Sequence, residues 1–109
     1  MEKIEGRIQD TSYRQLQEFW ETERMVITLA YTPICGTCQV AKRMLEVLAT
    51  LLPDLTFTKI NLNYDEQFSR DYEIMSVPCL IIYCDKECKE KIYALNSVPF
   101  LYKKITSYL

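Results

Sequence analysis

The sequence predicts an α/β fold that combines parallel strands with an antiparallel hairpin. Between residues 25 and 72, apolar segments with strand and helix character alternate in the order strand, helix, strand, helix. That order favours a parallel pair of strands joined by a right-handed crossover. Two further strand-like segments between residues 79 and 95 are too close together for a crossover and indicate a hairpin. The 109 residues, 49% of them hydrophobic, suit one domain over residues 1–109.

The first elements follow from apolar spacing. A short amphipathic helix is expected from Tyr13 to Glu23, because its apolar residues recur at helical spacing and Thr11 or Ser12 can serve as N-cap. The segment from Met25 to Tyr31 is apolar almost throughout and rich in strand formers, which predicts a strand buried on both faces.

A longer helix is expected from the cysteine motif at residues 35–38 to Leu52, where Pro53 ends it. The β-formers of Leu55 to Leu62 predict a second strand. The polar segment from Asp65 to Tyr72 is interpreted as a helix capped near Asn63.

The last part of the chain predicts the hairpin and a terminal helix. Strands are expected at Cys79 to Cys84 and at Lys91 to Leu95, with the charged residues 85–89 as the turn between them. Ser97 can cap a final helix with Pro99 in its first turn.

Composition excludes several classes of function. The chain has no histidine, which removes the Ser/His/Asp triad and every zinc site that needs imidazole. A formal net charge of −2 argues against a nucleic-acid partner. The longest apolar stretch, Met25 to Tyr31, is too short to cross a membrane, so no membrane association is expected. The polar residues 1–10 lack the apolar core of a signal peptide, and we expect a cytoplasmic protein.

The five cysteines, at positions 35, 38, 79, 84 and 88, are the most informative residues. In a reducing compartment a close cysteine pair is typical of catalysis, redox sensing or metal binding. Cys35 lies where a strand leads into a helix, and the unpaired N–H groups of a helix N-terminus favour a thiolate there. Cys38 lies one helical turn further on the same side, where it can resolve a mixed disulfide.

With Cys35-Gly-Thr-Cys38 between a strand and a helix, and Val77-Pro78 opening a later strand, the sequence resembles the thioredoxin family over nearly the whole chain. The resemblance implies a thioredoxin fold, which is a three-layer α/β/α sandwich with a central mixed sheet, and a cis peptide bond at Pro78. It implies a thiol–disulfide oxidoreductase that reduces protein or low-molecular-weight disulfides, requires no bound cofactor, and is recycled by a reductase not yet identified.

The resemblance also implies a docking surface around Cys35 for an extended segment of the substrate, with the backbone of Val77 pairing to that segment. Its apolar collar would consist of Ile34, Gly36, Thr37, Val77, Pro78, Ala94 and Leu95.

Several residues depart from the family pattern. Ile34 replaces the usual aromatic residue, and Thr37 replaces the usual proline of the motif. Leu29 stands where thioredoxins carry a buried acid, while Lys59 matches the lysine near that acid and is expected to be the remaining charge below the site. Our hypothesis is that, without the acid, Cys38 loses its proton more slowly and the mixed disulfide is resolved more slowly at neutral pH.

Two other functions remain open at this point. A non-catalytic binding module could use the same collar without turnover, and a disulfide-reduction assay separates it from an enzyme. A structural zinc site could use Cys35, Cys38, Cys84 and Cys88. In the implied fold, however, a strand of about 3.3 Å per residue carries Cys84 on the order of 17 Å from Pro78, so the four cannot share one metal.

The remaining cysteines have simpler expectations. Cys84 and Cys88 would be two exposed thiols in a charged turn, although a disulfide or a shared soft metal is possible there. Cys79 is expected to pack as a small hydrophobic residue, with trapping of intermediates by a third thiol near the redox pair as the alternative.

Overall fold

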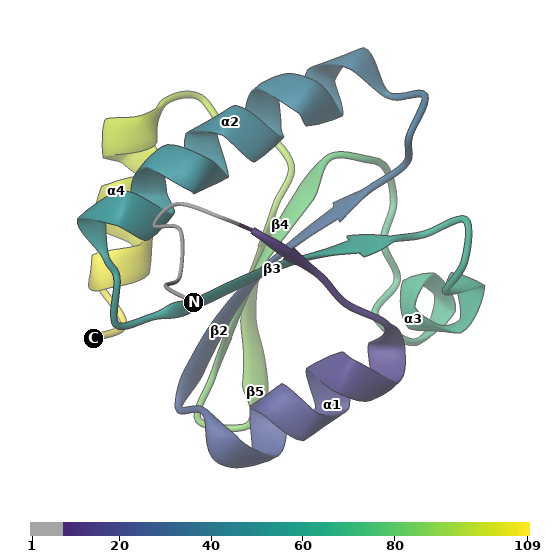
Figure 1. Cartoon of the computed structure of the whole chain (residues 1–109), viewed down its shortest axis with the longest axis horizontal. Coiled ribbons are helices and arrows are strands. Elements are labelled where there is room, and N and C mark those ends of the chain that lie inside the picture. The colour runs from purple at the N-terminus through teal and green to yellow at the C-terminus, as the bar shows by residue number, and fades with distance from the viewer. Residues whose placement is uncertain (1–7) are drawn as a thin grey trace, which may run out of the picture.

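A five-stranded mixed sheet with helices on both faces organises residues 8–109, the part of the chain that the computed structural model describes (Figure 1). Residues 1–7 lie outside the described residues, and most of the polar start discussed above falls there. The elements in chain order are β1 (Gln9–Asp10), α1 (Tyr13–Thr22), β2 (Met25–Tyr31), α2 (Gly36–Leu51), β3 (Thr56–Asn61), α3 (Glu66–Asp71), β4 (Cys79–Cys84), β5 (Glu87–Ile92) and α4 (Val98–Thr106).

The strand order in the sheet is β1-β3-β2-β4-β5. Strands β1, β3 and β2 run parallel to one another, whereas β4 is antiparallel to β2 and β5 is antiparallel to β4. The central position of β2 explains its composition, because a strand with a neighbour on each side and helices above and below must be apolar on both faces. The expected strand from Met25 to Tyr31 is confirmed at both ends.

Two apolar cores lie on opposite faces of this sheet. Helices α2 and α4 cover one face, and their buried leucines and isoleucine pack there against the odd-numbered residues of β2. Helices α1 and α3 cover the other face, where Leu16, Trp20 and Phe68 form the second core. Figure 1 shows the two pairs of helices on either side of the strands. The expected three-layer α/β/α sandwich with a mixed sheet is confirmed.

Local capping fixes the starts of the helices. Ser12 caps α1 in a capping box with Gln15, and Ser97 caps α4 by accepting a hydrogen bond from the N–H of Phe100. The cap of α3 was expected near Asn63, but the N-cap is Asp65, and its side chain makes no capping hydrogen bond.

The hairpin differs from the sequence prediction in its turn and second strand. The turn contains only Asp85 and Lys86, both with positive φ (54° and 66°), and β5 begins at once with Glu87. Paired positive φ values suit the twist of a two-residue hairpin, and Asp tolerates the left-handed region. The N–H of Asp85 donates to the carbonyl of Arg24 at 2.8 Å, and their side chains form an ion pair at 3.2 Å. The expected turn at residues 85–89 is therefore wrong, because the charged residues belong to the exposed face of an edge strand.

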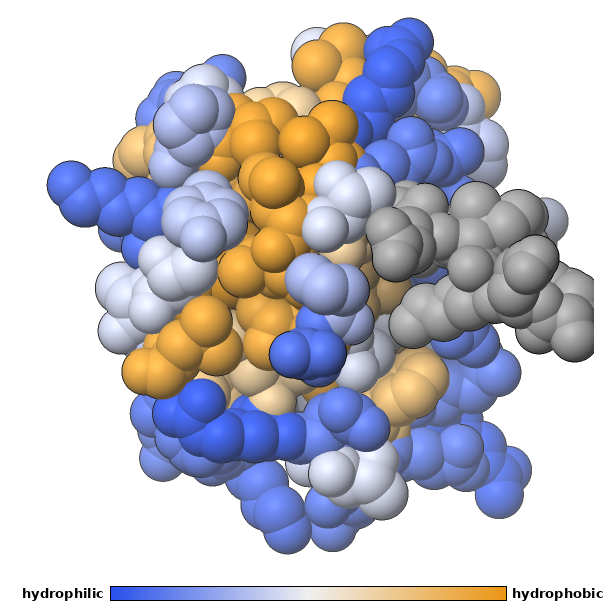
Figure 2. All heavy atoms as spheres, turned by 60° about the vertical axis from the view of Figure 1, so that its left-hand side comes forward, coloured by the Kyte–Doolittle hydropathy of each residue, from blue (hydrophilic) through white to orange (hydrophobic). Residues whose placement is uncertain are grey.

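The surface beside α2 and α4 is partly apolar. Figure 2 brings forward the side of the molecule that carries α4 and the C-terminus, and it shows hydrophobic side chains gathered in a band. On α2, the exposed hydrophobic residues are Val40, Val47 and Leu51. Among the described residues, no helix is both long enough and apolar enough to pass through a membrane.

Candidate active site

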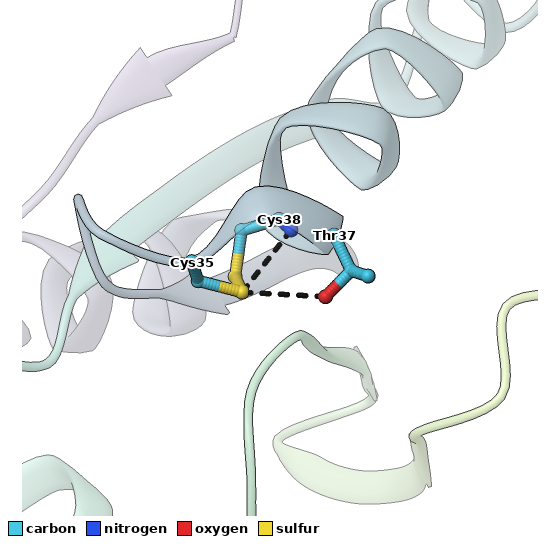
Figure 3. The surroundings of a disulfide bond; sticks show 3 residues. All are labelled: Cys35, Thr37 and Cys38. Carbon is cyan, nitrogen blue, oxygen red and sulfur yellow. Dashed lines mark hydrogen bonds between the residues drawn. A yellow bond between two sulfur atoms is a disulfide. The ribbon is translucent and has the colours of Figure 1, made fainter.

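The two cysteines of the motif lie at the N-terminus of α2 and form a disulfide (Figure 3). Cys35 is the N-cap of the helix, and its own N–H donates to the carbonyl of Thr32 at 3.2 Å, which closes the turn leading out of β2. The backbone N–H of Cys38 donates to the Cys35 sulfur at 3.1 Å. The side chain of an N-cap residue accepts hydrogen bonds from backbone N–H groups that have no partner within the first turn. This position therefore directs a backbone donor at the Cys35 sulfur.

The two sulfurs differ in accessibility. Cys35 is partly exposed at the molecular surface, whereas Cys38 lies beneath it with only 2% of its surface exposed. A substrate can therefore reach the Cys35 sulfur, while Cys38 is accessible chiefly from Cys35 itself. This asymmetry suits a nucleophile and a resolving thiol.

The segment that contains Val77 and Pro78 lies at the same end of the sheet. Their peptide bond is cis, as expected. In the register of β2 and β4, Ala30 faces Cys79, so the residues before Cys79 lie at the end of β2 from which the chain continues to Cys35. The hydroxyl of Tyr93 accepts a hydrogen bond from the N–H of Met75 at 3.1 Å, which ties this segment to the end of β5.

The collar residues have different accessibilities. Ile34 has 94% of its surface exposed, and Gly36, Thr37 and Ala94 are also exposed, whereas Val77 and Pro78 are half-buried. Leu95 differs from the expectation, because only 8% of it is exposed and it packs in the core beneath α2 and α4. Met75, which sequence reasoning missed, is exposed two residues before Val77.

Gly36 leaves open space next to Cys35. Apart from its two chain neighbours and the adjacent backbone of α2, a methyl group built on Gly36 would have no protein atom within 4 Å. A methyl side chain at position 36 would therefore not clash with other parts of the free protein. The open space is available to an approaching substrate.

The charged side chains below the site lie toward β1, the edge strand of the sheet, and not in the core. Leu29 has 1% of its surface exposed and lies in the apolar core. Lys59 faces Leu29 across the β2–β3 pair, and its ammonium lies 3.7 Å from the carboxylate of Asp10 and 5.6 Å from the ring centre of Tyr31. Lys59 is thus not the sole charge there, because the two-residue strand β1, which sequence reasoning missed, brings Asp10 to it.

Tyr31 completes this group. Its hydroxyl donates a hydrogen bond to Asp10 at 2.8 Å. Burial of the ring and this hydrogen bond to a carboxylate raise the pKa of Tyr31 to about 12, since both disfavour the phenolate.

The other three cysteines are free thiols. Cys79 is fully buried, and burial raises the pKa of its thiol to about 11, which leaves it protonated at neutral pH. Cys84 is 1% exposed, so the expectation of two exposed thiols holds for Cys88 but is wrong for Cys84. Burial likewise raises the pKa of both Cys84 and Cys88.

Cys84 and Cys88 cannot form a disulfide in this fold. Cys88 pairs with Tyr83, the residue before Cys84, and side chains alternate between the faces of a strand. Cys84 packs in the core under α2 and α4, whereas Tyr83 lies against the core on the other face. Within residues 8–109, His, Cys, Asp and Glu side chains form no group of three or more placed to hold a metal ion.

Comparison with known proteins now assigns the family. The family model described as Thioredoxin matches residues 7–107. The chain belongs to the thioredoxin family. The thioredoxin-like protein YusE of Bacillus subtilis is 45% identical over 75 residues, which cover 69% of this chain and 71% of that protein. The thioredoxin of Chlamydia pneumoniae is 31% identical over 77 residues, covering 71% and 76% of the two chains.

Solved thioredoxin structures share the fold. A mutant thioredoxin from Halobacterium salinarum superimposes with a TM-score of 0.87 at 23% identity, covering 99% of this chain and 96% of that one. Chloroplastic thioredoxin z superimposes with a TM-score of 0.85 at 17% identity, covering 99% and 97%. With its family and its Cys35–Cys38 pair, the protein is a thioredoxin-like thiol–disulfide oxidoreductase.

Proposed function

We propose that this thioredoxin-family member, acting as one unit over residues 1–109, reduces disulfides of proteins or of low-molecular-weight thiols. The observation that carries the proposal is the position of the Cys35 sulfur. Cys35 is partly exposed, and its sulfur caps α2 and is bonded to the almost fully buried Cys38. In such a site the first sulfur can react with the substrate, and the second sulfur can then resolve the mixed disulfide.

Reduction takes place in two exchanges. The thiolate of Cys35 attacks one sulfur of the substrate disulfide, the substrate S–S bond breaks, and the first substrate thiolate leaves and takes up a proton. Cys38 then loses its proton and attacks the Cys35 sulfur, which releases the second substrate thiolate. The substrate has gained two electrons and two protons, and the protein ends in the Cys35–Cys38 disulfide of Figure 3.

The substrate docks on the surface around Cys35, to which several apolar side chains contribute. Exposed Ile34 and Met75 and half-buried Val77 and Pro78 provide apolar contacts at this end of the sheet. The backbone of Val77 pairs with an extended substrate segment in the manner of an added strand. Gly36 leaves the approach to the sulfur open.

We place the protein in the cytoplasm, where the thiol pool keeps such a pair reduced and favours the reductive direction. A separate reductase, which returns two electrons to the Cys35–Cys38 disulfide after each cycle, is the second partner.

Single cysteine replacements test the order of the two exchanges. We expect Cys38→Ser to accumulate a mixed disulfide with the substrate, detectable by mass spectrometry under non-reducing conditions. Cys35→Ser should lose activity, and Cys88→Ser, which removes an exposed thiol outside the pair, should retain it. Reduction of insulin by Cys35→Ser at the parent rate would overturn the mechanism, and equal inactivity of the parent would instead favour a non-catalytic binding module.

Gly36→Ala tests the approach of the substrate. Because the added methyl group meets no atom beyond its chain neighbours and the adjacent helix backbone, the free energy of unfolding should not fall by more than about 0.5 kcal/mol. We expect a higher KM for protein disulfides and a smaller effect on a small disulfide such as oxidised glutathione. An unchanged KM for both substrates would contradict docking across residue 36.

A further inference from the structure

The side chain between the two cysteines carries a hydroxyl that is directed at the reactive sulfur. The Thr37 Oγ1 lies 3.4 Å from the Cys35 Sγ, and Figure 3 shows the sulfur contacted by this hydroxyl and, in a second direction, by the N–H of Cys38. A sulfur in a disulfide carries no proton. The hydroxyl must therefore be the donor in this contact, and the sulfur the acceptor.

The contact follows from the local geometry of the helix start. Cys35 is the N-cap, and Thr37 and Cys38 belong to the first turn of α2, so the donors of both residues lie on the side of the turn that faces the cap. The Thr37 side chain is exposed, and it has no other hydrogen-bond partner among the described residues. Two donors of the same turn, one from the backbone and one from a side chain, thus converge on one sulfur.

We propose that Thr37 is a catalytic residue of this protein, whose hydroxyl donates a hydrogen bond to the Cys35 thiolate and makes Cys35 a more readily ionised nucleophile and a better leaving group. The proposal rests on the function proposed above and concerns the same site. A hydrogen bond to an ionised acceptor is stronger than one to a neutral acceptor, so the hydroxyl stabilises the thiolate more than it stabilises the thiol or the disulfide.

The same argument predicts the redox equilibrium. When the protein dithiol reacts with oxidised glutathione, the protein loses two electrons and two protons, its Cys35–Cys38 bond forms, and the glutathione S–S bond breaks to give two thiols. A donor that stabilises the thiolate favours the reduced protein, provided the pH is high enough for Cys35 to be ionised. Thr37 therefore makes the protein a weaker reductant than it would be with an apolar residue at this position.

Two replacements separate the hydroxyl from the rest of the side chain. Thr37→Val keeps the branched shape and removes the donor, whereas Thr37→Ser keeps the donor and removes a methyl group. In each reduced protein, the alkylation rate of Cys35 is measured against pH by peptide-level mass spectrometry, which separates it from Cys88. The equilibrium with reduced and oxidised glutathione is measured as a second, independent readout.

We expect Thr37→Val to lower the alkylation rate of Cys35 about threefold to tenfold on the acidic side of the profile and to leave the plateau at high pH within about twofold, as the loss of a long, exposed, charge-assisted bond predicts. The glutathione equilibrium should shift toward the protein disulfide by a similar factor at neutral pH. Thr37→Ser should stay within about twofold of the parent in both measurements.

The outcomes distinguish the two proposals. If the parent alkylates at Cys35 with the pH profile of free cysteine, the proposed nucleophile itself fails. If the parent is ionised at lower pH but Thr37→Val has the same profile and the same glutathione equilibrium, the nucleophile stands and the role of Thr37 is overturned. Equal shifts in Thr37→Val and Thr37→Ser would also overturn it, because they would trace the effect to packing of the methyl group.

Discussion

Replacing Leu29 with aspartic acid tests whether the core below the site can stabilise a buried carboxylate. Leu29 lies on the central strand β2 with 1% of its surface exposed, packed in the core beneath α2 and α4. Lys59 faces Leu29 from β3, but its ammonium forms an ion pair with the Asp10 carboxylate, 3.7 Å away, at the sheet edge. A carboxyl group at position 29 would therefore be surrounded by apolar side chains.

The structure sets the size of the effect. Truncating a buried leucine costs about 2–5 kcal/mol, and a buried polar group without a partner costs about 1–3 kcal/mol more. Leu29→Asp and the matched control Leu29→Asn should therefore both be less stable than the parent by about 3–8 kcal/mol. Typical domains are stable by about 5–15 kcal/mol, so both variants are studied at low temperature and at acidic pH first.

The pH dependence distinguishes the two variants. Burial disfavours the carboxylate, so in Leu29→Asp the folded protein keeps a proton that the unfolded chain releases above about pH 4. With fewer protons bound in the unfolded state, the free energy of unfolding falls as pH rises, by at most about 1.4 kcal/mol per pH unit. Between pH 5 and 7 the acid variant should lose about 1–3 kcal/mol that the amide variant retains.

Urea denaturation of both variants across this pH range is the assay. Parallel stability curves for Leu29→Asp and Leu29→Asn would refute the reasoning, and so would a rise with pH for the acid variant, because that rise would mean that Lys59 leaves Asp10 and stabilises the new carboxylate. At a pH where both variants are folded, the same pair tests whether the missing acid slows resolution by Cys38. Equal pH profiles of mixed-disulfide resolution in the two variants would contradict that hypothesis.

Two further predictions concern groups away from the redox pair. The hydroxyls of Thr28 and Thr58 are both buried and bond only to each other, at 2.9 Å, within residues 8–109. Thr28→Val should therefore lower the free energy of unfolding by about 1–3 kcal/mol, while adding Thr58→Val should recover most of that loss, and additive losses in urea denaturation would disprove the pairing. In native protein at pH 8, iodoacetamide should modify Cys88 at least about tenfold faster than Cys79 or Cys84, because Cys88 is exposed whereas the fold buries Cys79 and Cys84 and restricts access to them. In urea the three thiols should react at similar rates, and equal rates in the native protein would show that these strands are not buried as described.

Sequence patterns were sufficient to predict those strands and helices whose burial requires a continuous or periodic pattern of apolar residues. The strands at 25–31 and 79–84 have the predicted bounds, because segments buried on both faces must be apolar throughout. The helix after the cysteine motif was also predictable, since its apolar residues recur at three- and four-residue steps and Pro53 follows its end.

The errors at the two ends of the sheet share a different cause. Strand β1 contains only Gln9 and Asp10, and β5 carries mostly charged side chains, so neither has an apolar pattern to detect. Both are edge strands, whose outer residues face solvent and whose existence depends on hydrogen bonds to a neighbouring strand. The wrong prediction that Cys84 is exposed has the same origin. Cys84 was assigned to the edge of a turn, but it is the last residue of β4 and its side chain faces the core under α2 and α4.

The sequence by itself determined the α/β class, the central strands and the pair of cysteines at a helix start, because these depend on local spacing and on contacts among neighbours in the chain. Only the tertiary structure decided that Leu95 lies in the core, that Asp10 reaches Lys59 and Tyr31, and that Cys84 and Cys88 lie on opposite faces of the sheet. The position of Asp10 depends on pairing between strands distant in sequence, that of Cys84 and Cys88 on the register of the hairpin, and that of Leu95 on the packing of helices over the sheet. A shift of one residue in that register turns a side chain from one face to the other, and local residue pattern does not specify it for short or charged strands.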